Sequence, residues 1–151
     1  MVYRETKDPR FLKTAMGMAD FYLNHKNLPQ DKIPYWDFNA EEEGYTPGAR
    51  SYANKVHTRY RDASAAAITA SALFELSGFA GSKSTEYRDA AIEMLHSLAS
   101  DEYCATAGGN GNFVLKHCVG SIPHNSEVDM PLVYADYYFI EALQRYKNSL
   151  K

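Results

Sequence analysis

The chain has 151 residues, 45% of them hydrophobic, and a formal net charge of −3, which suits one domain with a moderate core. It contains no basic block or stripe, so nothing in the charge pattern supports nucleic-acid binding. No apolar run reaches the length of about 18 residues that predicts a membrane span, and residues 1–8 lack the apolar core of a signal peptide.

The first predicted helix runs from Pro9 to about Asn24. Asp8 is a typical N-cap and proline is favoured at the first helical position. Apolar side chains recur at three- and four-residue spacing along one stripe, with charged residues off it. The pattern predicts an amphipathic helix that packs on the rest of the protein and also faces water.

An aromatic segment follows at residues 33–38, with the sequence Ile-Pro-Tyr-Trp-Asp-Phe. Pro34 argues against a central strand, so this segment is predicted to be an extended loop or edge. Residues 39–60 are rich in glutamate, glycine, proline and basic or aromatic residues. They predict a long surface loop or insertion, of a length that is usually either functional or disordered.

The central predicted helix covers residues 62–76. Asp62 is its expected N-cap, and Gly78 suits a left-handed position after its end. Alanine, serine and threonine occur on nearly every side, and Glu75 is the only charged residue between the caps. A surface helix would carry a polar face, so this helix is predicted to be buried almost all round.

Two further helices complete the chain. Residues 82–98 show an amphipathic spacing, and residues 132–146 are largely apolar and aromatic, with Asp129 as the expected cap. Between them, a Gly-rich turn at 107–112 is predicted to join Cys104 to residues 113–117 in a small β-hairpin. Amphipathic and enclosed helices therefore alternate, which predicts one all-α domain over residues 1–151, built of outer and inner helices in hairpins.

The cysteines and histidines leave two alternatives. Cys104 and Cys118 could pair, but two cysteines make no disulfide framework, and free buried thiols are the default. His117, Cys118, His124 and Asp129 invite a zinc interpretation, yet their spacing matches no common zinc pattern. No metal and no cofactor is predicted.

Four ordered blocks together resemble one family. They are residues 33–38, residues 61–65 (Arg-Asp-Ala-Ser-Ala), residues 120–125 (Gly-Ser-Ile-Pro-His-Asn) and residues 134–143 (Tyr-Ala-Asp-Tyr-Tyr-Phe-Ile-Glu-Ala-Leu). The combination resembles the C-terminal part of the unsaturated glucuronyl hydrolases, glycoside hydrolases of the family numbered 88. The resemblance covers almost the whole chain apart from about residues 41–60.

This resemblance implies part of an (α/α)6 barrel, with Met1, Val2 and Tyr3 at the end of an inner helix. The family removes an unsaturated uronic acid from oligosaccharides released by polysaccharide lyases. An aspartate protonates the vinyl ether, water adds at the neighbouring carbon, and the resulting hemiketal collapses. This differs from displacement by two carboxylates at an anomeric carbon.

The resemblance also implies that the family's two catalytic aspartates precede anything in this sequence. Asp37, Asp62, Asp129 and Asp136 are not those residues, so no catalytic residue is assigned and the lone chain is expected to be inactive. Arg61 and Asp62 are interpreted as structural, as an ion-pair partner and a helix cap.

The loops before the two inner helices are expected to line the mouth of the barrel. The candidate substrate-binding residues are Trp36, Ser121, His124 and Ser126, and the expected partner is an unsaturated uronyl oligosaccharide. Packing under the loop stays open for Trp36, and a hydrogen bond to backbone stays open for His124. The tyrosines at 134, 137 and 138 are interpreted mainly as packing residues.

A second hypothesis is a non-catalytic helical module that binds carbohydrate or associates with itself. Two helical hairpins would leave apolar inner faces uncovered, and such a patch exceeds the few hundred Å² that soluble monomers expose. The chain is therefore expected to form a homo-oligomer or to need a missing N-terminal part.

Overall fold

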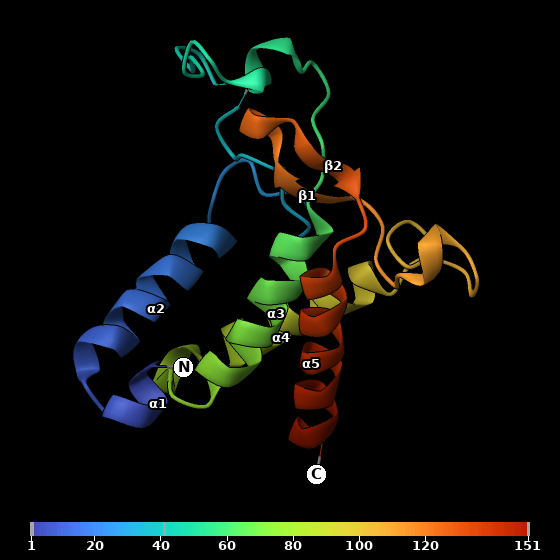
Figure 1. Cartoon of the computed structure of the whole chain (residues 1–151). Helices are drawn as coiled ribbons and strands as arrows, with labels where there is room; N and C mark the ends of the chain where they lie inside the picture. Colours follow the sequence, from blue (N-terminus) through green and yellow to red (C-terminus); the bar gives the residue numbers. More distant parts are fainter. Residues whose placement is uncertain (1, 41, 151) are drawn as a thin grey trace.

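The computed structural model describes residues 2–40 and 42–150. Within them lie five α-helices and a two-stranded antiparallel sheet (Figure 1): α1 (Val2–Thr6), α2 (Pro9–Leu23), α3 (Ala63–Ser77), α4 (Ser84–Leu98), β1 (Cys118–Ser121), β2 (Ser126–Met130) and α5 (Val133–Ser149). Met1 and Glu41, which the sequence predictions assign to an inner helix and to the loop 39–60, lie outside the described residues. In the described part, no helix combines the length and apolarity that crossing a bilayer requires.

Helix α2 begins and ends as predicted. The Asp8 carboxylate accepts a hydrogen bond from the backbone N–H of Arg10 at 2.9 Å, and Pro9 occupies the first helical position. The backbone N–H of Asn24 closes the last turn by donating to the Asp20 carbonyl. The Asp20 carboxylate also holds α2 to α4, since it accepts from Tyr87 Oη at 2.7 Å and Lys83 Nζ at 2.6 Å.

Helix α3 lies at the centre and packs against both α4 and α5 (Figure 1). Its small side chains make this possible: Ala63, Ala66, Ala67 and Ala70 have no exposed surface. Small residues let neighbouring helices approach closely, so their dispersion contacts are dense. The predicted cap Asp62 is confirmed.

One detail of the α3 prediction is wrong. Gly78 is right-handed, with φ −67°, because it continues the helical geometry into a following turn where Phe79 donates to the Leu76 carbonyl. The predicted burial almost all round is confirmed: within α3 only Ile68, at 39%, and Ala72 are exposed. One narrow stripe of the helix therefore faces solvent.

The main core joins α2, α3, α4 and α5, and a second, smaller core lies apart from it. The small core holds Ala53, Val119 and Ile122, with Trp36 packed against them. It connects the loop 39–60 to the β1–β2 hairpin. Together these segments form a cap at the end of the molecule where α3 and α5 begin (Figure 1).

The predicted hairpin is misplaced. The Gly-rich turn does bring Cys104 opposite Leu115, but only as an isolated antiparallel bridge. The sheet forms further along, where Ser121 pairs with Ser126. The sequence of β2 is polar and exposed, so it lacks the alternation that identifies a half-buried strand.

The predicted cap of the last helix is also wrong. Helix α5 begins at Val133, after Leu132, and has no side-chain cap. Asp129 lies in β2, where its carboxylate contacts His117. Pro131 disfavours helical geometry in the residue before it, which delays the start of the helix.

Both cysteines are free, as the default interpretation predicts, but only Cys118 is buried and Cys104 is half-buried. Cys118 is fully buried, and this burial raises the pKa of its thiol to about 12. The thiol is therefore protonated at neutral pH and behaves as a small apolar side chain.

Candidate functional site

The predicted site residues lie together in the cap. Ser121 ends β1, His124 lies in the short turn Ile122–His124, and Ser126 begins β2 opposite Ser121. Trp36 belongs to the same cap, since it packs against the small core that includes Ile122. The structure thus brings the three hairpin residues together at the tip and sets Trp36 beneath them.

The side chains of Ser121 and His124 contact each other. The hydroxyl Oγ of Ser121 and Nδ1 of His124 are 2.8 Å apart. The partner of His124 is therefore a side chain rather than the backbone, which was the alternative from the sequence. His124 and Ser126 are exposed, so their polar groups can exchange hydrogen bonds with the hydroxyls of a sugar.

A second histidine, His117, pairs with an aspartate at the base of the same hairpin. Nδ1 of His117 lies 2.7 Å from Oδ1 of Asp129. The two histidines thus belong to separate pairs. Among residues 2–40 and 42–150, no group of three or more His, Cys, Asp or Glu side chains is placed to hold a metal ion.

The backbone of the hairpin is unusual. His117, Asn125, Glu127 and Asp129 all have φ between 51° and 57°, a region that costs most residues other than glycine, asparagine and aspartate some free energy. Such conformations persist only where the surrounding structure fixes them. The hairpin therefore has a defined shape.

Gly120 is needed for that shape. A Cβ at this position would lie 2.2 Å from Oε2 and 2.8 Å from Cβ of Glu127. The Glu127 side chain crosses β1 in the space that the glycine leaves.

Asp62 and Arg61 hold the cap on the helices. Oδ1 of Asp62 accepts from the backbone N–H of Ser64 at 3.0 Å and of Val119 at 3.2 Å, and so joins the start of α3 to β1. Arg61 donates to the Ile33 carbonyl at 3.0 Å and forms an ion pair with Asp31. The structural roles predicted for both residues are confirmed.

Asp136 has an equivalent role in α5. Its two carboxylate oxygens accept from the backbone N–H groups of Val114 and Leu115, at 2.8 and 2.9 Å. Asp37 accepts from the backbone N–H of Asn39 at 2.8 Å. These carboxylates and those of Asp62 and Asp129 are therefore all engaged in holding the chain's own loops.

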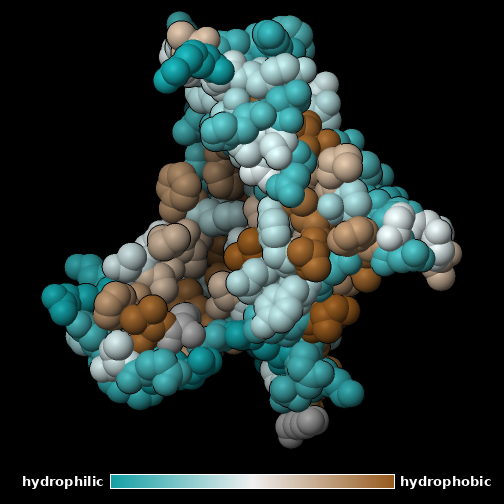
Figure 2. All heavy atoms as spheres, viewed as in Figure 1, coloured by the Kyte–Doolittle hydropathy of each residue, from teal (hydrophilic) through white to brown (hydrophobic). Residues whose placement is uncertain are grey.

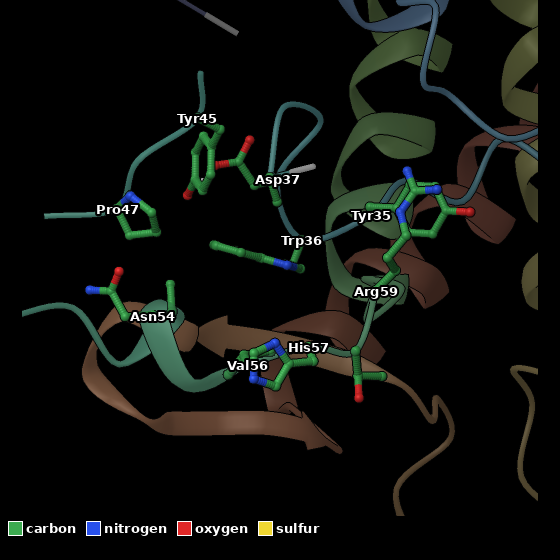
Figure 3. A pocket seen from close by; sticks show the side chains of 12 residues that line it. Tyr35, Trp36, Asp37, Tyr45, Pro47, Asn54, Val56, His57 and Arg59 are labelled. Atoms are coloured by element: carbon green, nitrogen blue, oxygen red, sulfur yellow. The ribbon is translucent and has the colours of Figure 1, made fainter. Parts of the chain in front are cut away.

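Beside Trp36, the loop 39–60 encloses a hollow of about 380 Å³. The indole of Trp36 lies between Tyr45 and Pro47 on one side and Val56 and His57 on the other (Figure 3). Sequence reasoning identified Trp36 but not the residues of the loop that face it. The unusual length of the loop was the one signal that could have directed attention to them.

Exposed apolar side chains gather on α2, α3 and α5, on a surface that we call the open face. They are Met18, Ile68, Val133, Tyr137 and Ile140. The open face includes an apolar groove of about 290 Å³ between α2 and α3, and Figure 2 shows apolar side chains there and further toward α5. Charged side chains, among them Glu75, Glu141 and Arg145, line the surface between α3 and α5. On α5, Val133 is 74%, Tyr137 61% and Ile140 55% exposed. The enclosed packing expected of this helix is thus found on the side that faces α3 and α4, while the opposite side is exposed.

The chain was compared with known proteins, and no family model matches it. It is 45% identical over 148 residues to an unsaturated glucuronyl hydrolase of Formosa agariphila, and 29% identical over 147 residues to an unsaturated chondroitin disaccharide hydrolase of Streptococcus agalactiae. These alignments cover 98% and 95% of this chain but 33% of each relative, so the chain spans about a third of their length.

A solved unsaturated glucuronyl hydrolase specific for heparin has the same fold over 98% of this chain and 36% of its own, with a TM-score of 0.80 and 44% identity. The resemblance predicted from four short blocks is therefore confirmed along the chain. The predicted fold class, part of a helical barrel with a small β-hairpin, is confirmed with it.

Proposed function

We propose that this chain forms the C-terminal part of an unsaturated glucuronyl hydrolase, a glycoside hydrolase. Along almost its whole length it is similar to about a third of the length of such an enzyme. The observation that carries the proposal is 45% identity over 98% of the chain. The reaction would remove an unsaturated uronic acid from oligosaccharides released by polysaccharide lyases. A proton adds to one carbon of the vinyl ether and water adds at the other. The hemiketal then opens and releases the remaining sugar.

We propose further that this part binds the sugar attached to the unsaturated uronic acid. Ser121, His124 and Ser126 present hydroxyl and imidazole groups at one exposed hairpin tip. Trp36 supplies an aromatic face in the same cap. An apolar face with a few convergent polar groups is the usual composition of a sugar site.

The 151 residues alone are expected not to catalyse the reaction. The aspartates at 37, 62, 129 and 136 each hold a loop or a histidine of the chain itself. A general acid needs a carboxyl group directed at the substrate. The catalytic acids would then come from the part of the enzyme that this chain does not match.

A chimera tests this proposal. Mixing an unsaturated chondroitin disaccharide with the lone chain is expected to leave the ultraviolet absorbance of the conjugated enol ether unchanged. Substituting the chain for the matching third of the Formosa agariphila relative is expected to give a protein that removes the absorbance. In that chimera, replacing both Ser121 and His124 with alanine should raise KM about tenfold, equivalent to about 1.4 kcal/mol of binding.

His96→Ala is the matched control, because this exposed histidine lies on α4 outside the cap. It should leave KM unchanged. A folded chimera without activity would contradict the proposal, and so would steady hydrolysis by the lone chain.

The open face favours a second candidate, a module that associates with itself. We propose that this face is covered, either by the rest of a barrel or by a second copy of the chain. Its exposed side chains include Met18 at 69% and Tyr137 at 61%, and large exposed apolar side chains gathered on one surface often mark interaction sites.

Sedimentation of the lone chain should therefore give a mass that rises with concentration. The double substitution Tyr137→Glu and Ile140→Glu is expected to return the chain to the monomer mass. Burying two carboxylates in the interface would cost more free energy than the interface contributes. A monomer at all concentrations in the unchanged chain would argue against self-association.

A further inference from the structure

We infer that the hollow between Trp36 and the loop 39–60 is a second sugar subsite, which binds an uncharged pyranose ring further along the oligosaccharide than the ring at the hairpin tip. This inference deepens the proposed function and rests on it. It implies that the chain favours oligosaccharides longer than a disaccharide.

The hollow has the size and lining that a sugar ring needs. Its volume of about 380 Å³ falls in the range of small-molecule sites, about 300 to 1,000 Å³. Trp36, Tyr45 and Pro47 supply flat apolar surface, while Asn54 and His57 supply polar groups (Figure 3). Rings stack on aromatic faces through their C–H groups, and their hydroxyls need hydrogen-bond partners at the edges.

The walls of the hollow are held in place before any ligand binds. The backbone N–H of Trp36 donates to the Tyr60 carbonyl at 3.0 Å, and Tyr35 forms an antiparallel bridge with Arg61. On the other wall, the Asn54 side chain donates to the carbonyls of Gly48 and Ser51, each at 3.0 Å. A preformed site loses less conformational entropy on binding.

Among the residues that the structure describes, two opposite charges line the hollow, the carboxylate of Asp37 and the guanidinium of Arg59, so the hollow has no excess positive charge to offset the desolvation of an anionic ring. Asp37 lines it with a carboxylate, which repels sulfate and carboxylate groups on a ligand. That carboxylate accepts from Tyr45 Oη at 3.3 Å and from the Asn39 backbone, and it keeps further lone pairs for a sugar hydroxyl. The guanidinium of Arg59 is stacked 3.8 Å from the centre of the Tyr35 ring.

The loop that forms the hollow packs against the hairpin. The short turn Tyr52–Lys55 lies against the turn Ile122–His124, and Ala53 and Ile122 share the small core. In the proposed complex, one ring contacts His124 and the next ring of the same oligosaccharide contacts Trp36.

The fluorescence of Trp36 provides a direct test, because the chain has a single tryptophan. The unchanged 151-residue chain is titrated with an unsaturated disaccharide of glucuronic acid and glucose, and with an unsaturated tetrasaccharide that extends it by two uncharged rings. The tetrasaccharide is expected to bind about tenfold more tightly, as one stacked ring contributes. An unsaturated chondroitin tetrasaccharide, whose third ring carries a carboxylate, is expected to bind more weakly than the tetrasaccharide with an uncharged third ring.

Tyr45→Ala and His57→Ala should each reduce the preference for the tetrasaccharide to less than about threefold, the loss expected for one contact. His57 is exposed, so His57→Ala tests the hollow without disturbing the fold. Tyr52→Ala is the matched control, because Tyr52 lies in the same loop but does not line the hollow. The control should keep the full preference.

Equal affinity for the disaccharide and the tetrasaccharide, absence of binding by either, or a preference for the chondroitin tetrasaccharide would each overturn the inference. The inference would also be overturned if the Tyr45→Ala and His57→Ala variants both kept the full preference for the tetrasaccharide over the disaccharide. Replacing Ser121 and His124 with alanine separates the two proposals. If that change leaves disaccharide binding intact while the tetrasaccharide preference persists, the proposed sugar binding at the hairpin tip is wrong. The second subsite in the hollow is then still supported.

Discussion

Replacing Asp62 with alanine is expected to lower the free energy of unfolding by about 3 kcal/mol, from about 1 for the helix cap and about 2 for an orphaned buried donor. Oδ1 of Asp62 accepts from the N–H groups of Ser64 and Ala65 at the start of α3 and from that of Val119 in β1. Val119 is buried, so water does not replace the lost acceptor for its N–H group.

Urea unfolding followed by the helical circular dichroism signal measures this change, which corresponds to a fall in melting temperature of about 6 to 12 °C for a chain of this size. Asp62→Asn keeps the acceptor oxygen and loses only the charge, so it should cost about 1 kcal/mol. Ser51→Ala, which removes the cap of the short turn Tyr52–Lys55 alone, is the second control. Equal losses for Asp62→Ala and Asp62→Asn would show that the charge, not the acceptor, matters.

Replacing Ala70 with leucine is expected to destabilise the protein by about 3 kcal/mol through overpacking. Ala70 has no exposed surface and lies in the middle of α3, between α4 and α5. Three additional carbon atoms fit there only if the neighbouring helices separate, which weakens dispersion contacts along their length.

Ala72→Leu provides a matched control in the same helix, because Ala72 lies on the exposed stripe. It should change the free energy of unfolding by less than about 0.5 kcal/mol. Thermal unfolding of both variants gives the comparison. Similar stabilities for the two would mean that α3 is not enclosed as the structure indicates.

The helices could be predicted because their signals are local. Asp8 followed by Pro9, and Asp62 followed by a run of alanines, mark starts that depend on neighbouring residues alone. Asp129 resembles the same signal, yet its carboxylate is used by His117, twelve residues earlier in the chain. A sequence pattern does not reveal when a distant partner competes for a cap.

The same reason limits prediction of the site. Residues 120–126 could be assigned as a unit because a short turn brings Ser121 to His124. The hollow forms because the isolated bridge between Tyr35 and Arg61 brings the two ends of the loop together, so that Tyr45 and His57 lie near Trp36. Such pairing over a long loop leaves no periodic signature, so Trp36 could be predicted as a candidate and its neighbours could not.

The separation of the two cores has an evolutionary consequence. Ala53, Val119 and Ile122 form a core of their own, which shares none of its buried residues with the large core of α2, α3, α4 and α5. Mutations at distant sites that share no partners have nearly additive effects on stability. Natural selection can therefore alter the loop 39–60 in length and sequence, and with it the choice of ligand, while the helical scaffold keeps its stability.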